Sequence, residues 1–243
     1  MTMSYPSTLQ PSDTIPSQSQ ERYQAVLFDL DGTLADTAPD LAAAVNKLRQ
    51  RRGLDLLPLE VLRPLASAGA RGLIGEAFGI TPEHAEFAAM RDEFLANYAA
   101  DICVESALFP GIHALLDNLD TRGIRWGIVT NKVARLTQPL AALLGLDTRT
   151  GCIVSGDTTA HAKPHPAPLL YAADALGVAP EHILYVGDDL RDIQAGHAAA
   201  MATVAAAYGY CGDGLAPEAW QARFLVRSPA ELQALLRDIT YPG

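Results

Sequence analysis

The sequence predicts an α/β protein with a doubly wound parallel sheet and a helical cap domain inserted after the first strand. Three observations predict this fold. Short apolar runs alternate with segments of helical periodicity. The apolar runs are continuous rather than alternating, which is typical of parallel strands covered by helices on both faces. One long stretch, residues 39–106, interrupts the alternation because it contains only helical patterns.

Six apolar runs are the predicted strands of the sheet. They cover residues 25–28, 126–129, 153–154, 183–186, 202–205 and 224–226. Between and after them, residues 112–119 and 232–239 carry apolar side chains at the spacing i, i+3, i+4 and i+7 of a core-facing helix. Helices that alternate with strands predict right-handed crossover connections.

The helical stretch defines the predicted domain boundaries. The catalytic core is expected to comprise residues 21–38 and 107–243, and the cap domain to comprise residues 39–106. The two hinges between them are expected near residues 37–39 and 107–110. A cap joined by two hinges can open and close over a site on the core.

Residues 1–20 are predicted to be a disordered tail. They are rich in Ser, Thr, Pro and Gln and contain no Lys or Arg. A secretory signal would need a basic start and an apolar stretch, and this segment has neither.

The composition excludes several classes of function. The net charge is −10, which argues against a nucleic-acid partner because phosphate backbones require clustered cations. The longest apolar runs are too short to cross a membrane. The three cysteines, Cys103, Cys152 and Cys211, form no CxxC pair and indicate reduced thiols in a cytoplasmic protein.

Two carboxylates follow the first predicted strand directly. Asp29 and Asp31 stand there with Gly32, which permits a tight turn and close approach of the backbone to an anion. In an open α/β sheet, ligands bind beyond the carboxyl ends of the strands. Paired carboxylates also suit a hard cation such as Mg²⁺. Taken alone, the run is equally consistent with an ordinary Asp-Gly turn.

Three further segments place polar groups at the same edge of the sheet. Thr130 and Asn131 follow the second strand, Lys163 lies in a Lys-Pro-His-Pro run, and Asp188 follows another strand with Asp192 shortly after. Each has an ordinary explanation alone, such as a helix cap or a surface charge. Their order predicts one site that combines a hydroxyl, a cation and several carboxylates.

These four segments resemble the four motifs of the haloacid dehalogenase-like phosphatases. The resemblance extends from about Arg22 to the C-terminus. It implies a Rossmann-like core with a cap, Mg²⁺ as the cofactor, and hydrolysis through an aspartyl-phosphate. The enzyme's partner is then a small phosphorylated organic acid, and the sequence leaves both a monomer and a homodimer open.

The resemblance also implies a role for each catalytic residue. Asp29 is expected to be the nucleophile that attacks phosphorus. Asp31 is expected to be the general acid for the leaving alcohol and then the base for water. Lys163 is expected to bind the transferring phosphoryl group and to hold Asp29, with Thr130 and Asn131 beside that group.

The metal site implied by the resemblance uses oxygen ligands only. Mg²⁺ is expected to bind Asp29, Asp188 and the backbone carbonyl of Asp31, while Asp192 orients Lys163 or a metal-bound water. Haloacid dehalogenases are similar in fold but lack the second aspartate, so Asp31 favours phosphoryl transfer.

The cap contains a candidate for substrate recognition. Residues 67–72 carry two glycines and Arg71, and are predicted to form a loop that dips toward the site. Arg71 is expected to pair with a substrate carboxylate in a bidentate geometry. The alternative is a surface arginine at the start of a helix.

The substrate implied first is 2-phosphoglycolate. Residues 129–132, 163–166 and 208–210 resemble the phosphoglycolate phosphatase subgroup. Residues 67–74 resemble at least as much its relative, N-acetylmuramic acid 6-phosphate phosphatase. Two further readings stay open: a β-phosphoglucomutase-like phosphomutase, which a sugar bisphosphate would activate, and a non-enzymatic binding protein, which a measured turnover would exclude.

Overall fold

The structure is a computed structural model of the 243-residue chain, and it describes residues 22–212 and 214–242. The predicted tail, residues 1–20, lies outside the described residues and stays a prediction. Within the described residues, no helix has both the length and the apolar character needed to cross a membrane.

A parallel sheet of six strands forms the centre of the molecule, in the order β5-β4-β1-β6-β7-β8. The strands are β1 (Ala25–Phe28), β4 (Arg125–Val129), β5 (Ile153–Val154), β6 (Ile183–Gly187), β7 (Ala202–Ala206) and β8 (Phe224–Val226). The six predicted strands are confirmed, and no boundary differs by more than one residue. From β1 the chain continues on one side to β4 and β5, and later on the other side to β6, β7 and β8.

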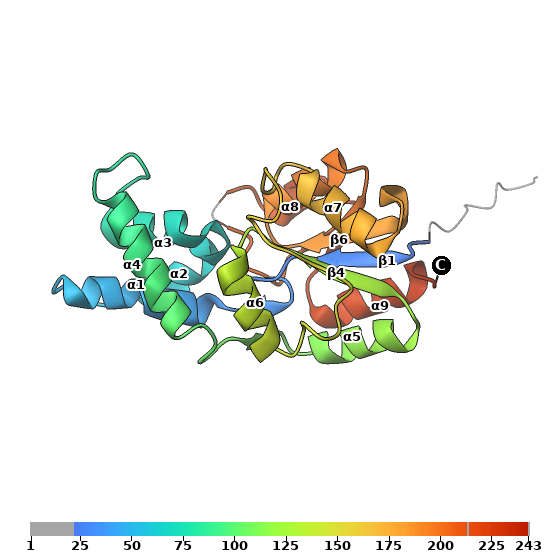
Figure 1. Cartoon of the computed structure of the whole chain (residues 1–243), viewed down its shortest axis with the longest axis horizontal. Helices are drawn as coiled ribbons and strands as arrows, with labels where there is room; N and C mark the ends of the chain where they lie inside the picture. The colour runs from blue at the N-terminus through green and yellow to red at the C-terminus, as the bar shows by residue number, and fades with distance from the viewer. Residues whose placement is uncertain (1–21, 213, 243) are drawn as a thin grey trace, which may run out of the picture.

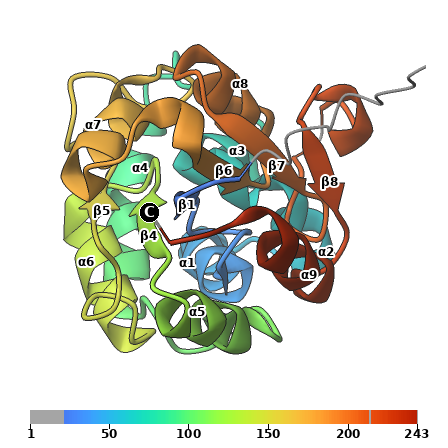
Figure 2. The same cartoon turned by 90° about the vertical axis from the view of Figure 1, so that its right-hand side faces the viewer.

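Helices cover both faces of this sheet, as the doubly wound prediction requires (Figure 2). On one face lie α7 (Ala167–Leu176) and α8 (Leu190–Ala198). On the other lie α5 (Ile112–Thr121), α6 (Ala134–Leu143) and α9 (Pro229–Ile239). Short 3₁₀ turns, η2 (Pro180–His182) and η3 (Pro217–Ala219), complete the connections.

The side chains of β1 show why an uninterrupted apolar run is needed here. Ala25 and Leu27 pack into the apolar cluster under α7, whereas Val26 and Phe28 pack into the cluster with α5 and α9. All four are fully buried. Successive strand residues point to opposite faces, so a central strand covered twice has no position for a polar side chain.

Four helices between the first and second strands of the sheet lie beyond its carboxyl edge (Figure 1). They are α1 (Ala38–Arg51), α2 (Leu59–Leu62), α3 (Gly69–Phe78) and α4 (Phe87–Ala100), with the 3₁₀ segment η1 (Arg63–Ala68) between α2 and α3. They pack mainly against one another. The predicted cap, residues 39–106, contains them all except the first residue of α1.

Two features of this region differ from the expectation. Residues 67–72 are helical rather than a loop, because η1 ends there and α3 begins at Gly69, whose φ is 57°. A small antiparallel ribbon, β2 (Ala35–Asp36) with β3 (Ala107–Leu108), joins the two chain crossings between cap and core. Two-residue strands are too short to show any periodicity in a sequence.

Candidate active site

The predicted site residues meet at the carboxyl end of β1, where the strand order changes direction. Asp29 follows β1, Thr130 follows β4, and Asp188 follows β6. Because β1 lies between β4 and β6, these three residues are neighbours. The backbone N–H of Asp29 donates to the carbonyl of Val186 at 2.9 Å, which extends the strand pairing up to the site. Such a position is the usual ligand site of a doubly wound sheet.

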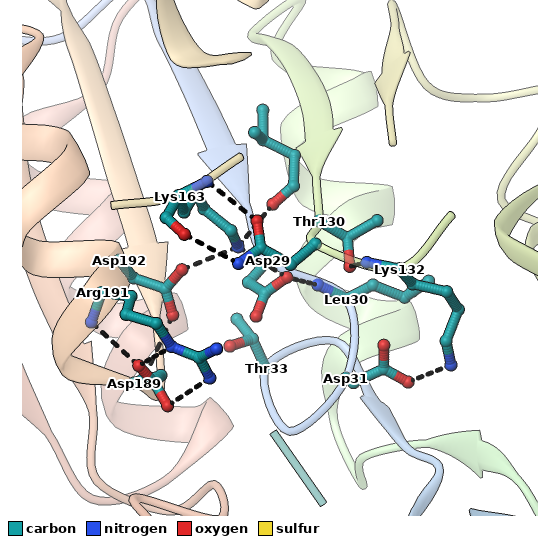
Figure 3. Close-up of polar contacts among 12 residues, drawn as sticks. Asp29, Leu30, Asp31, Thr33, Thr130, Lys132, Lys163, Asp189, Arg191 and Asp192 are labelled. Carbon is teal, nitrogen blue, oxygen red and sulfur yellow. Dashed lines mark hydrogen bonds and ion pairs between the residues drawn. The ribbon is translucent and has the colours of Figure 1, made fainter. Parts of the chain in front are cut away.

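Lys163 lies among the carboxylates of the site. Its Nζ is 3.0 Å from Oδ1 of Asp29 and 2.7 Å from Oδ1 of Asp192 (Figure 3). It also donates to the carbonyl of Val129 and to the hydroxyl of Tyr185, both at 2.9 Å. Burial lowers the pKa of Lys163, but Asp192 and Asp29 outweigh this effect and raise it. The ammonium therefore stays charged beside the nucleophile candidate.

Two residues hold Lys163 in this place. Asn131 accepts from the backbone N–H of Lys163 at 2.9 Å and donates to its carbonyl at 3.0 Å. Asp192 receives a hydrogen bond from the backbone of Asp189 at 3.1 Å and lies 2.9 Å from the Tyr185 hydroxyl. The structure thus brings Asn131 to the lysine loop, and it gives Asp192 the contact with Lys163 expected of an orienting residue.

Asp29 is held by one of its two carboxylate oxygens. Its Oδ1 accepts from the backbone N–H of Leu30 at 2.8 Å as well as from Lys163. Burial raises the pKa of Asp29 to about 7, Lys163 opposes that rise, and Asp192 and Asp31 add to it. A further cation beside Asp29 would lower its pKa and favour the ionised carboxylate at neutral pH.

Asp188 is fully buried and has no ion-pair partner among the described residues. Its Oδ1 accepts from Thr33 Oγ1 at 2.8 Å, and its Oδ2 accepts from the backbone N–H of Tyr210 at 2.9 Å. Burial and the charges of Asp29 and Asp192 raise its pKa well above the ordinary value. A buried carboxylate without a cation is costly, so this position is suited to a metal ion.

The donor set fits a hard cation. Carboxylate oxygens of Asp29, Asp188 and Asp192 lie within 4.8 Å of one another. Both oxygens of Asp192 already accept, Oδ1 from Lys163 and Oδ2 from the backbone of Asp189, whereas Asp29 is held through Oδ1 alone and Asp188 has no cationic partner among the described residues. Asp29 and Asp188 are therefore the carboxylates that would hold Mg²⁺. Gly32 makes this cluster possible: its φ is 84°, and a Cβ there would stand 2.2 Å from Oδ2 of Asp188.

Asp31 points away from the Asp29–Lys163 pair. Its Oδ1 accepts from Nζ of Lys132 at 2.6 Å and from the hydroxyl of Thr37. Nζ of Lys132 also lies 2.8 Å from the hydroxyl of Tyr98, which belongs to α4 of the cap. Lys132 and Tyr98 are absent from the sequence-based site, although Lys132 directly follows Thr130 and Asn131 and so shares their strand end.

A cavity of about 380 Å³ lies over these residues, between the core and the cap. From the core it is lined by Asp29, Asp31, Thr130, Lys132, Lys163 and Arg191. From the cap it is lined by residues 66–70 and by apolar and aromatic side chains of α1 and α4, among them Phe94 and Tyr98. One wall of the cavity is therefore charged, and the opposite wall is largely apolar.

Arg71 is not brought to this cavity. It is exposed on α3, and its charge acts on Glu83, whose pKa is lowered chiefly by its hydrogen bonds and slightly by Arg71. The preceding residues, 67–70, do line the cavity. Helical rotation of about 100° per residue turns Arg71 to another side, which a loop would not have imposed.

Arg191 lines the cavity instead, and no motif in the sequence indicated it. Its Nε and Nη2 bind the two carboxylate oxygens of Asp189 at 2.7 and 2.8 Å. Nη2 also donates to the carbonyl of Ser67 at 2.8 Å, and the Ser67 hydroxyl lies 3.2 Å from Oδ2 of Asp188. The cap therefore contacts the core directly at the metal-site candidate.

Comparisons with known proteins agree with this geometry. A family model described as haloacid dehalogenase-like hydrolase matches residues 23–200. A phosphoglycolate phosphatase of Xanthomonas campestris pv. campestris (strain 8004) is 46% identical over 209 residues, which are 86% of this chain and 94% of that protein. An N-acetylmuramic acid 6-phosphate phosphatase of Pseudomonas putida is 40% identical over 215 residues, 88% of this chain and 96% of that protein.

A solved structure supports the fold independently. The crystal structure of a predicted phosphoglycolate phosphatase from Haemophilus somnus 129pt superimposes with a TM-score of 0.77 at 28% identity. It covers 88% of this chain and 97% of its own. With the family model spanning most of the sheet and the whole cap, the chain belongs to the haloacid dehalogenase-like hydrolase family.

Proposed function

We propose that the protein is a Mg²⁺-dependent phosphatase that hydrolyses a small phosphorylated carboxylic acid through an aspartyl-phosphate on Asp29. One observation carries the proposal. Asp29 is bonded to the buried cation of Lys163, and it shares a cluster with Asp188, a buried carboxylate without an ion-pair partner among the described residues. A carboxylate with one positive charge at Lys163 and a second at the Asp188 position can approach a phosphate dianion, because both cations reduce the repulsion between the two anions.

In the first step, an oxygen of Asp29 attacks phosphorus and forms an O–P bond. The bond between phosphorus and the ester oxygen breaks, and Asp31 gives its proton to the leaving oxygen. Lys163 binds the phosphoryl oxygens as charge spreads over them, and Thr130, buried at the cavity wall, lies beside them. Asp31 lines the same cavity as Asp29, so both act on one bound ester.

In the second step, Asp31 takes a proton from water. The water oxygen bonds to phosphorus, the bond from phosphorus to Asp29 breaks, and inorganic phosphate leaves. Asp29 is regenerated as a carboxylate. The cap excludes bulk water from this intermediate while its helices cover the cavity.

The residues present suit Mg²⁺, and Asp29, Asp188 and the backbone carbonyl of Asp31 would be its protein ligands. When bound, it neutralises charge on the phosphoryl oxygens and orients them for in-line transfer. The raised pKa of Asp188, caused by burial first and then by Asp29 and Asp192, supports a cation at this position.

Our first substrate is 2-phosphoglycolate, because the Xanthomonas relative that carries the name phosphoglycolate phosphatase matches 86% of the chain. N-acetylmuramic acid 6-phosphate is the second. The cavity of about 380 Å³ favours it, since this space exceeds the needs of a two-carbon ester and suits a sugar phosphate. Both substrates carry a phosphate and a carboxylate.

Cys103, Cys152 and Cys211 are free thiols, which supports an enzyme that works in the cytoplasm.

A kinetic panel tests this function. Release of phosphate is measured with Mg²⁺ for both substrates, p-nitrophenyl phosphate and a series of sugar phosphates. We expect the largest kcat/KM for one of the two carboxylated esters. Turnover of none of these esters would refute the phosphatase, and activation of a sugar phosphate reaction by its bisphosphate would identify a phosphomutase instead.

A further inference from the structure

We infer that Lys132 of the core and Tyr98 of the cap together form the subsite that binds the carboxylate of the substrate. The inference rests on the proposed function, because it assigns the second anionic group of a phosphorylated carboxylic acid to named side chains. It replaces Arg71, the candidate from the sequence, with a pair that spans the boundary between core and cap.

The position of Lys132 is the first observation. Its side chain is only 8% exposed, and it lines the cavity that also contains Asp29 and Lys163. Figure 3 shows Lys163 on one side of Asp29 and Lys132 on the other. An ammonium has three N–H donors, and two are used by Asp31 at 2.6 Å and Tyr98 at 2.8 Å. One donor remains for a ligand.

Tyr98 supplies a second donor at the same place. Its hydroxyl oxygen accepts from Lys132, and its own proton has no acceptor among the residues that the structure describes. The side chain is buried and stacks on Phe94, with ring centroids 6.5 Å apart, so the hydroxyl is held in position. Two donors whose heavy atoms lie 2.8 Å apart match the two oxygens of a carboxylate.

Asp31 shows that a carboxylate fits on Lys132. In the structure, Oδ1 of Asp31 forms an ion pair with the Lys132 ammonium, the same kind of contact that a substrate carboxylate would make. A substrate carboxylate on the remaining donor of Lys132 would lie beside Asp31, the residue that proton transfer requires.

The other cations near the cavity are engaged elsewhere. Lys163 contacts two carboxylates, a carbonyl and a tyrosine hydroxyl at the phosphoryl end. Arg191 uses Nε and Nη2 to bind both oxygens of Asp189 and the Ser67 carbonyl, which leaves only Nη1 without a hydrogen bond among the described residues. Among residues 22–212 and 214–242, Lys132 is the cation lining the cavity that combines an unused N–H donor with a neighbouring tyrosine hydroxyl whose proton has no acceptor.

Matched substrate pairs test the subsite. N-acetylmuramic acid 6-phosphate is compared with N-acetylglucosamine 6-phosphate, and 2-phosphoglycolate with ethyl phosphate; within each pair the second ester lacks the carboxylate. The readout is the ratio of the two kcat/KM values. We expect Lys132→Met to lower this ratio about 10- to 100-fold, the range for a charged hydrogen bond, and Tyr98→Phe to lower it about 3- to 10-fold. Lys132→Arg should restore most of it.

Two further variants make the test specific. Arg71→Met removes the competing candidate, and Arg91→Met removes an exposed cation on α4, the helix that carries Tyr98. Both should leave the ratio within about twofold of wild type. An unchanged ratio in Lys132→Met, or a loss of the ratio in Arg71→Met, would overturn the subsite.

A binding measurement separates this inference from the proposed function. Titration calorimetry of Asp29→Asn with each member of the N-acetyl sugar pair reports carboxylate recognition without turnover. We expect the carboxylated ester to bind more strongly than its partner, and we expect Lys132→Met in the same background to abolish this difference. That result supports the subsite even if the enzyme hydrolyses neither ester. Equal binding of both esters refutes it even if the protein proves to be a phosphatase.

Discussion

Gly209 lies so close to Asp188 that a methyl group on its Cα would stand 2.3 Å from the Cβ of Asp188. The same methyl group would stand 2.3 Å from the backbone oxygen of Gly32. The next residue, Tyr210, donates its backbone N–H to Oδ2 of Asp188 at 2.9 Å. The loop after β7 therefore presses directly on the buried carboxylate of the metal-site candidate, and it leaves no room for a side chain.

Gly209→Ala should displace Asp188 and impair the site. Since the neighbours are backbone and a buried side chain, we expect the free energy of unfolding to fall by about 1–3 kcal/mol. We expect kcat/KM to fall at least about tenfold, because small displacements of reacting groups are costly. Chemical denaturation and steady-state kinetics measure the two effects.

The control for this substitution is Gly214→Ala. Gly214 also has an ordinary φ, and a Cβ there would meet no atom within 4 Å. It should keep stability and activity close to wild type. Equal behaviour of the two variants would show that contact with Asp188 does not limit position 209.

Asp29→Asn should abolish turnover and leave the fold intact. The amide preserves the shape of the side chain and can still accept from the backbone of Leu30, but it cannot attack phosphorus. We expect kcat to fall at least about 1000-fold, with an unchanged circular dichroism spectrum. Residual kcat within about tenfold of wild type would mean that another residue is the nucleophile.

Chelation should remove the activity, and Mg²⁺ should restore it. Asp29 and Asp188 offer oxygen ligands only, which suit octahedral Mg²⁺ better than Zn²⁺. Ca²⁺ should inhibit, because its larger and looser coordination misplaces the nucleophile. Activity is measured after exhaustive EDTA treatment and then with each metal. Full activity without metal would exclude the proposed site.

Asp188→Asn should stabilise the metal-free protein. Burial and the charges of Asp29 and Asp192 raise the pKa of Asp188 above its ordinary value of 3.8, so the folded state binds this proton more tightly than the unfolded chain. By linkage, ionisation of Asp188 lowers the free energy of unfolding, and this loss increases as the pH rises from 3.8 to the raised pKa. In EDTA at about pH 7.5, we expect the variant to be more stable by about 1–2 kcal/mol.

Mg²⁺ should make the wild type more stable than Asp188→Asn, because it binds the folded wild type and binds the folded variant only weakly. Thermal unfolding in EDTA and in Mg²⁺, at several pH values, gives both comparisons. Asp147→Asn, an exposed aspartate, serves as the control and should change stability by less than about 0.5 kcal/mol in either buffer. A metal-free Asp188→Asn protein that is less stable than wild type would contradict the assignment of Asp188 as an unpaired buried charge.

Local sequence patterns were enough to predict the sheet and the edge at which the site lies. Continuous apolar runs identify parallel strands because each central strand is buried on both faces, as Leu27 and Phe28 are here. Asp29, Thr130 and Asp188 could be recognised since each directly follows such a run, and parallel strands bring their carboxyl ends to one edge. These are local patterns, and they can be recognised without knowledge of how the chain packs.

The direction in which each side chain faces, and the choice of cap residues that reach the core, could be read from the folded structure but not from the sequence. Arg71 and Ala70 are adjacent in sequence, yet only Ala70 lines the cavity, because the start of α3 turns successive residues to different sides. Lys132 and Tyr98 are 34 residues apart and meet across the boundary between core and cap. Contacts of this kind depend on how the cap helices pack over the sheet, and no periodicity along one segment encodes them.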